Sequence, residues 1–223
     1  MDLQLQLVQN GNAQAHASPE IPGLPKWAVW QNQAYGTTLE PVSFTYNKRL
    51  LPQDALPQSH ADLTRLLNEK SAVFKGKVAT FDPEKSGLGF LLATQDLKVS
   101  SAFWDLAKAL GGIGVKVYTS TGAMLERVSS GEHTLAYNII GSYGLLRQKT
   151  DPSIGLVFPK DYTLAFSRIA FISKAARHPN AAKLFLDYLL SKRGQGIMAN
   201  KSLIYSIRSD VDGVATAANL NKE

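Results

Sequence analysis

The sequence contains no cysteine, which excludes disulfide bonds, catalytic thiols and thiolate metal sites and leaves the redox compartment undecided. No stretch approaches the eighteen consecutive apolar residues of a membrane-spanning helix. The four histidines, His16, His60, His133 and His178, form none of the close pairs typical of a metal site. We therefore predict neither a bound metal nor a resident cofactor.

Familiar catalytic motifs are also missing. The chain has no G-x-S-x-G nucleophile turn, no Walker phosphate loop and no Rossmann glycine fingerprint. Asp82 and Glu84 lie in one turn, where two carboxylates are more typical of a solvent-facing surface than of acid–base catalysis. The sequence thus favours a binding protein over an enzyme, and we assign no catalytic residue.

The composition is that of a globular protein with a substantial core. Of its 223 residues, 44% are hydrophobic and 19% are charged, which suits one large domain or two small lobes. The net charge of +6 indicates either a solvated basic surface or a preference for small anions. The longest basic cluster is only 47–49, so we do not expect nucleic acid as a partner.

Three segments each combine a short strand, a polar turn and a helix. Strands separated by helices predict crossover connections and a largely parallel sheet, and hence an α/β fold. A helix over 100–110 is expected to bury Phe103, Trp104, Ala107 and Leu110. The three segments are 77–92, 115–128 and 134–148; the other predicted elements are a strand over 39–47, a helix capped by Ser59, an extended segment over 162–174 and a helix from Pro179.

The turn of each segment, which we call an elbow, combines a hydroxyl with a glycine. The elbows are Ser86-Gly87, Ser120-Thr121-Gly122 and Gly141-Ser142-Tyr143. The first amides of a helix lack internal partners and its dipole is positive there, so an elbow can bind phosphate, sulfate or carboxylate. Ordinary helix capping is the better explanation of any one elbow. Three in succession make a shared anion site an equal alternative to capping, because they could converge at one cleft.

The sequence offers a set of candidate ligand contacts outside catalysis. Arg168 interrupts an apolar segment, and a buried arginine needs an anionic partner, which is either the ligand or a carboxylate of the protein. The predicted contacts are Thr37, Thr38, Ser86, Gly87, Thr121, Gly122, Ser142, Tyr143 and Arg168.

Several stretches match a known family in the same order along the chain. They are Tyr46-Asn47-Lys48 at the end of the strand, the helix start from Ser59 to Leu63, the Lys75–Val78 stretch "KGKV", and the later stretches "SSGEHTLAYNIIGSY" and "HPNAAKLFLDYLLSKRGQ". Together they resemble the periplasmic substrate-binding proteins of bacterial ABC importers, in the iron(III), phosphonate and phosphoglycerate class.

The resemblance implies a two-lobed α/β fold that closes over a small anionic solute in the cleft between the lobes. It also implies a periplasmic protein that delivers this solute to an ABC permease in the inner membrane without catalysis. We expect residues 1–40 and 156–205 to form the remainder of lobe 1, residues 41–155 to form lobe 2, and residues 206–223 to form a polar tail that frays.

The chain departs from the family in two places. Iron-binding members carry two adjacent tyrosines after the late strand, whereas Gly141-Ser142 stands here with only Tyr143 nearby. This favours an organic phosphate, phosphonate or carboxylate, with iron(III) as the alternative. The opening "MDLQLQLVQNGNAQ" is no signal peptide and resembles a segment past the third strand, so we expect lobe 1 to be incomplete and a homodimer to cover its edge.

Two further alternatives remain open. The same fold serves as a sensor or as the effector domain of a transcription factor, although no helix-turn-helix segment is visible here. It also serves as an enzyme scaffold in tetrapyrrole synthesis, against which the absent cysteine argues.

Overall fold

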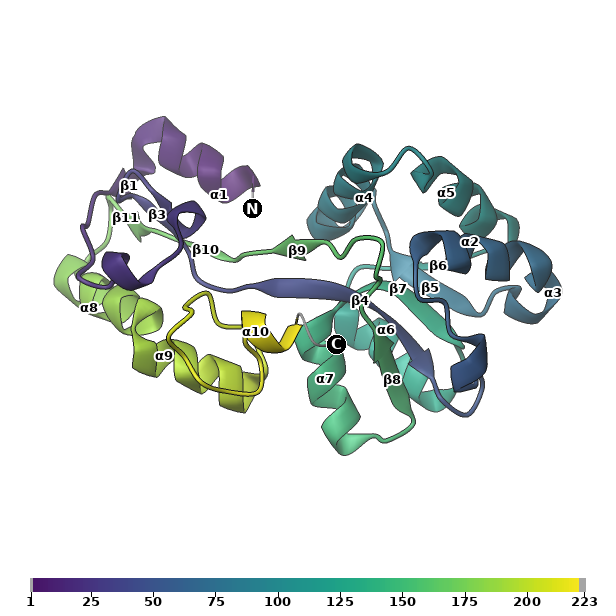
Figure 1. Ribbon diagram of the computed structural model, residues 1–223. Coiled ribbons are helices and arrows are strands. Elements are labelled where there is room, and N and C mark those ends of the chain that lie inside the picture. The colour runs from purple at the N-terminus through teal and green to yellow at the C-terminus, as the bar shows by residue number, and fades with distance from the viewer. Residues whose placement is uncertain (1, 221–223) are drawn as a thin grey trace. The chain divides into compact units, whose positions relative to one another are not determined.

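The computed structural model describes residues 2–220, which form two compact units (Figure 1). Unit 1 combines the chain up to Glu40 with the chain from Phe166 onward, and unit 2 is Pro41–Ala165. The second boundary lies at 165/166 and not at the expected 155/156, because strand β8 (Ile154–Val157) pairs with β4 in unit 2. Strand β9 (Ala165–Phe166) spans this second crossing.

Unit 2 is built on a mixed sheet with the strand order β6-β5-β7-β4-β8. The three strands at one end form parallel pairs, since β5 runs parallel to both β6 and β7, while β4 is antiparallel to β7 and β8. The α/β fold class is confirmed. The other strands are β4 (Glu40–Asn47), β5 (Val78–Phe81), β6 (Lys116–Tyr118) and β7 (Leu135–Ile140).

Helices cover both faces of this sheet (Figure 1). On one face Leu63, Leu67 and Leu106 pack against Phe44 and Val78 of the sheet in a single hydrophobic cluster. On the other face Gly144 of α7 approaches Thr45. The helices are α2 (His60–Glu69), α3 (Ser71–Phe74), α4 (Gly87–Val99), α5 (Phe103–Gly112), α6 (Thr121–Ser130) and α7 (Gly141–Thr150).

The buried face of α5 differs from the expected one. Leu106, Ala109 and Leu110 are buried, whereas Trp104 is 58% exposed. The helix packs on α2 as well as on the sheet. These two contacts decide which of its residues are buried, and the spacing of its large apolar residues alone does not predict them.

Unit 1 contains two small antiparallel sheets, β1-β11 and β10-β3-β2, packed with helix α8. Tyr35, Ile172, Leu186 and Leu190 form its main hydrophobic cluster. Pro179 opens α8 as predicted. The elements are α1 (Asp2–Leu7), β1 (Ala13–Gln14), β2 (Val29–Trp30), β3 (Ala34–Gly36), β10 (Ile169–Ala170), β11 (Ile172–Ser173), α8 (Pro179–Leu190), α9 (Lys192–Ile197) and α10 (Ala217–Leu220).

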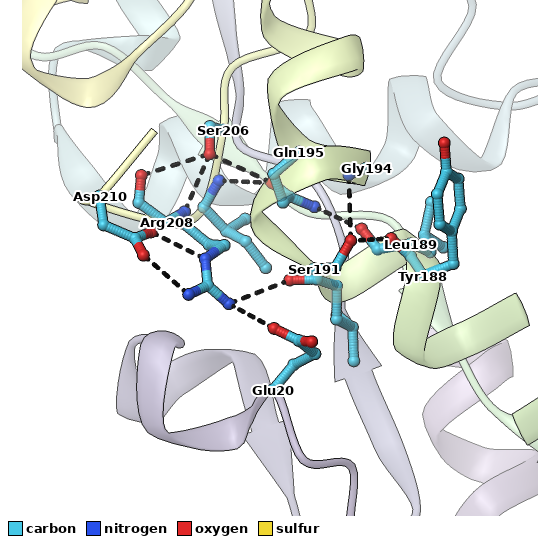
Figure 2. Close-up of polar contacts among 11 residues, drawn as sticks. Glu20, Tyr188, Leu189, Ser191, Gly194, Gln195, Ser206, Arg208 and Asp210 are labelled. Carbon is cyan, nitrogen blue, oxygen red and sulfur yellow. Dashed lines mark hydrogen bonds and ion pairs between the residues drawn. The ribbon is translucent and has the colours of Figure 1, made fainter. Parts of the chain in front are cut away.

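The segment after residue 205 packs into unit 1 and is not the fraying tail that we expected. Figure 2 shows the hydrogen bonds of Arg208 in this segment. Its Nε and Nη2 donate to the Asp210 carboxylate at 2.8 and 2.9 Å. Arg208 Nη1 donates to Glu20 Oε2 at 2.9 Å, which ties the segment to the first part of the chain. Residues 221–223 of the predicted tail lie outside the described residues.

A second polar anchor holds the same segment (Figure 2). Gln195 is fully buried on α9, and its Oε1 accepts hydrogen bonds from the Ser206 hydroxyl at 3.3 Å and the Ile207 amide at 3.0 Å. Its Nε2 donates to the Thr37 and Leu189 carbonyls, each at 3.0 Å. Because these buried groups satisfy one another, the start of the segment, residues 206–208, is held in the interior of unit 1.

Candidate functional site: the elbows of unit 2

The three elbows lie at one edge of the unit 2 sheet. Strand β5 is parallel to both of its neighbours, so the carboxyl ends of β6, β5 and β7 share an edge in that order. Helices α6, α4 and α7 begin there, and each is at least ten residues long. This edge is where ligands bind in open α/β sheets.

In the first elbow the Ser86 hydroxyl caps helix α4. Its Oγ accepts a hydrogen bond from the Gly89 amide at 3.1 Å. The turn before it is closed by Asp82, whose Oδ1 accepts from the Glu84 and Lys85 amides at 2.9 and 3.1 Å. The amides of Gly87 and Leu88 then remain in the first turn, where a helix offers no internal acceptor.

The second elbow has the same construction with a different capping residue. Ser120 Oγ accepts from the Ala123 amide at 3.3 Å and caps α6. Thr121, which we had predicted as a ligand contact, is buried at the first helical position, and Gly122 beside it is exposed.

The third elbow has no side-chain cap, because α7 starts directly after β7 with Ile140 at the N-cap. A Cβ atom on Gly141 would lie 2.9 Å from the Pro41 carbonyl oxygen and 2.9 Å from the Phe158 ring. Packing therefore requires this glycine. Ser142 is buried, whereas Tyr143 is 43% exposed.

Packing does not require the glycines of the first two elbows. A Cβ atom on Gly87 or Gly122 would meet no described atom within 4 Å, and neither residue has a positive φ. A glycine that neither packing nor backbone conformation requires is useful where a ligand approaches the main chain closely. These two positions are the parts of the site most open to an anion.

The remaining predicted contacts form a separate cluster in unit 1. The Thr37 amide and hydroxyl donate to the Arg168 carbonyl at 2.9 and 3.1 Å, and the Arg168 amide donates to Thr38 Oγ1 at 3.0 Å. The Arg168 guanidinium donates to both carboxylate oxygens of Glu40 through Nε at 2.6 Å and Nη2 at 2.9 Å. Glu40 is fully buried, and Arg168 is 48% exposed at its side chain.

Two buried carboxylates, Glu40 and Asp96, were not among the predicted site residues. Glu40 could have been noticed as an acid at the start of an apolar strand. Asp96 follows Gly89 and Leu92 on the buried side of α4, at helical spacing. At both positions an acidic residue stands where the apolar pattern of the strand or helix predicts a hydrophobic one. An acid at a buried position indicates a paired or functional group.

The site is suited to holding an anion by backbone amides. Among residues 2–220, no three His, Cys, Asp or Glu side chains are grouped so that they could hold a metal ion. None of the helices within this range is long and apolar enough to cross a membrane.

Comparisons with known proteins agree with this architecture. The sequence model of a family described as bacterial extracellular solute-binding protein matches residues 2–222. The crystal structure of the substrate binding protein of the ABC transporter from Agrobacterium tumefaciens is similar, with 38% identity and a TM-score of 0.94. The match covers 99% of this chain and 65% of that chain, so this chain spans slightly less than two thirds of the relative's length.

Two more distant structures share the fold. Iron-bound HitA from Pseudomonas aeruginosa is 22% identical, with a TM-score of 0.73 over 94% of this chain and 68% of its own. AfuA from Actinobacillus pleuropneumoniae, with exogenous fructose-6-phosphate bound, is also 22% identical, with a TM-score of 0.72 over 93% of this chain and 66% of its own. From the match over nearly its whole length, the chain belongs to the family of bacterial extracellular solute-binding proteins.

Proposed function

We propose that this chain is a periplasmic solute-binding component of an ABC import system that binds a small anion without chemical change. The favoured ligand is an organic phosphate, a phosphonate or a carboxylate, bound at the elbow edge of unit 2. Its partner would be an ABC permease of the inner membrane, as the description of the Agrobacterium relative suggests.

One observation carries the anionic part of the proposal: the openness of Gly87 and Gly122 at helix starts that follow adjacent parallel strands. The first turn of a helix presents unpaired N–H groups and a partial positive charge, and phosphate or carboxylate oxygens accept from both. Small neutral solutes would gain only the hydrogen bonds. An anion would gain the electrostatic term as well.

The distant relatives do not decide the ligand. One was solved with iron and the other with a sugar phosphate, and at 22% identity each supports the fold alone. We favour the phosphate or carboxylate class because the elbows offer main-chain amides, which are hydrogen-bond donors and not metal ligands.

Isothermal titration calorimetry on the whole chain tests the proposal. The panel would be glycerol 3-phosphate, methylphosphonate, malonate, iron(III) citrate and glucose. We expect at least one of the three organic anions to bind more tightly than glucose. Gly87→Val or Gly122→Val should lower the affinity for that anion by about tenfold or more, because the added side chain keeps the ligand from the amides.

Gly111→Val is the matched control. Gly111 also lies in a helix with no described atom near its ideal Cβ position, but it is near the end of α5 and away from the elbows. Its substitution should leave anion affinity unchanged. Equal binding of glucose and of every anion, or equal losses in all three glycine variants, would contradict the proposal.

A further inference from the structure

Unit 2 contains a second hollow, which none of the nine predicted ligand contacts lines. It is a cleft of about 210 Å³ bounded by α4, α5 and strands β5, β6 and β7. Its walls are mainly apolar and include Phe81, Leu92, Phe103, Leu110, Val115 and Val117. The polar lining groups are Thr80, Asp96, Tyr137 and Asn138.

A distortion of β7 brings its two polar residues to the same place. In the pairing with β4, Ile139 lies opposite Ser43 and Ala136 opposite Thr45, so Tyr137 and Asn138 together face the single residue Phe44. This is a β-bulge, and Asn138 has a left-handed backbone with φ of 60°. Successive side chains of a regular strand point to opposite faces, whereas a bulge can re-aim one of them.

The side chains of Tyr137 and Asn138 both bind Asp96. The Tyr137 hydroxyl donates to Asp96 Oδ2 at 2.7 Å and the Asn138 amide donates to the same oxygen at 2.8 Å. Among residues 2–220, the second oxygen, Oδ1, accepts only the longer bond from the Tyr162 hydroxyl, at 3.2 Å. Oδ1 therefore retains acceptor capacity, but Asp96 has no exposed surface, so a ligand reaches this oxygen only when the Tyr162 hydroxyl moves aside.

Within the described part of the chain, this buried carboxylate forms no ion pair with a lysine or arginine, although His60 lies near enough for its charge to oppose the effect of burial on the Asp96 pKa. Asp96 is fully buried, it forms none of the described ion pairs, and no lysine or arginine lines the cleft. The nearest titratable groups are Tyr137, Tyr162 and His60, whose ring stacks on Tyr162 and whose Nδ1 binds Asp161. Burial raises the pKa of Asp96, because the ionised form loses its hydration.

We propose that this cleft binds a small apolar molecule carrying a protonated amine, with the ammonium at Asp96 and the apolar body between α4 and α5. A buried carboxylate prefers a cation that can also donate a hydrogen bond. A cavity of roughly 150 Å³ accepts benzene, so about 210 Å³ accommodates a benzene ring with a short aminomethyl arm. None of the predicted elbow contacts lines this amine cleft, but Gly89, in the first turn of α4, does, so the cleft adjoins the first elbow.

The test uses benzylamine, with benzyl alcohol and benzoate as probes of similar size, in protein-observed NMR titrations of the whole chain. Benzylamine should shift the signals of cleft residues, including Leu92 and Val117, and should bind at least about tenfold more tightly than benzyl alcohol. Asp96→Asn should remove this preference and leave benzyl alcohol bound. Benzoate should not shift the cleft signals.

Two measurements keep the test decisive if Asp96→Asn fails to fold. Ala107→Met adds apolar volume to the cleft lining and should lower the affinity for both benzylamine and benzyl alcohol. On the unmodified protein, benzylamine should bind more tightly as the pH rises and Asp96 ionises, while benzyl alcohol should not respond. Equal affinities for the three probes, shifts confined to other residues, or no saturable shift with benzylamine would overturn the proposal and leave Asp96 as a structural tie between α4 and β7.

Discussion

At the scale of single residues, the ion pair of Arg168 and Glu40 bears on whether Arg168 binds the ligand or a carboxylate of the protein. The fully buried Glu40 carboxylate receives a two-point contact from Arg168, whose side chain is 48% exposed. Thr38 Oγ1 donates to the same carboxylate at 2.9 Å. The buried partner of this pair is thus Glu40, and the half-exposed Arg168 supplies its counter-charge inside unit 1; a ligand role for Arg168 stays a prediction.

Replacing Arg168 separates these roles. Arg168→Ala leaves the Glu40 carboxylate buried with a weaker set of partners, so we expect the free energy of unfolding to fall by about 1–3 kcal/mol. Urea denaturation measures this change. The double variant Arg168→Ala with Glu40→Gln should recover part of the loss, because the buried charge is gone.

Arg177→Ala provides the control, since Arg177 is an exposed arginine of the same unit. If Arg168→Ala costs no more stability than Arg177→Ala but weakens anion binding, the guanidinium serves the ligand and our structural interpretation of the pair is wrong.

At the scale of elements, the strand–elbow–helix segments were predictable because their signals are local. A short β-branched run, a serine at the cap and an apolar helix each report on neighbours within a few residues. Ser59, Ser86 and Ser120 cap their helices in the structure. In the second elbow Ser120 marked where helix α6 begins, but the sequence did not show that Thr121 would be buried.

Elements held by distant partners could not be predicted in the same way. The exposed Trp104 reflects how α5 packs against α2, which its own spacing does not encode. The segment after residue 205 looked like a polar tail because its anchors lie outside it: Glu20 is 188 residues from Arg208, and Gln195 belongs to the preceding helix α9. The bulge of β7 depends on the pairing with β4 and leaves no trace in the pattern of Tyr137 and Asn138.

The anchor of the C-terminal segment gives a prediction at this scale. Arg208→Met keeps the apolar stem but removes the charged hydrogen bonds to Glu20 and Asp210, so the free energy of unfolding should fall by about 1–3 kcal/mol. Arg193→Met on the exposed surface of α9 is the matched control and should change it by less than about 0.5 kcal/mol.

Limited proteolysis gives a second readout for Arg208→Met. If Arg208 anchors the segment, cleavage after residue 205 should become faster in this variant than in Arg193→Met. Equal cleavage rates and equal unfolding midpoints for the two variants would show that the segment is held by other contacts.

At the scale of the whole molecule, the chain is assembled from two units that alternate along the sequence, with crossings after Glu40 and Ala165. The first crossing was predictable because strand 39–47 is clear in the sequence. The second was misplaced because the expected boundary, 155/156, falls inside β8, which pairs with β4 in unit 2. The homodimer stays a prediction.

We propose that elbow amides of unit 2 hold the anionic solute. The most direct test is a ¹⁵N NMR titration of the whole chain with the organic anion that binds best in calorimetry. The account predicts that the largest amide shifts in unit 2 fall on Gly87, Leu88 and Gly122, with Gly111 unmoved. Saturable binding that leaves these three amides unshifted and moves signals elsewhere in unit 2 would contradict it.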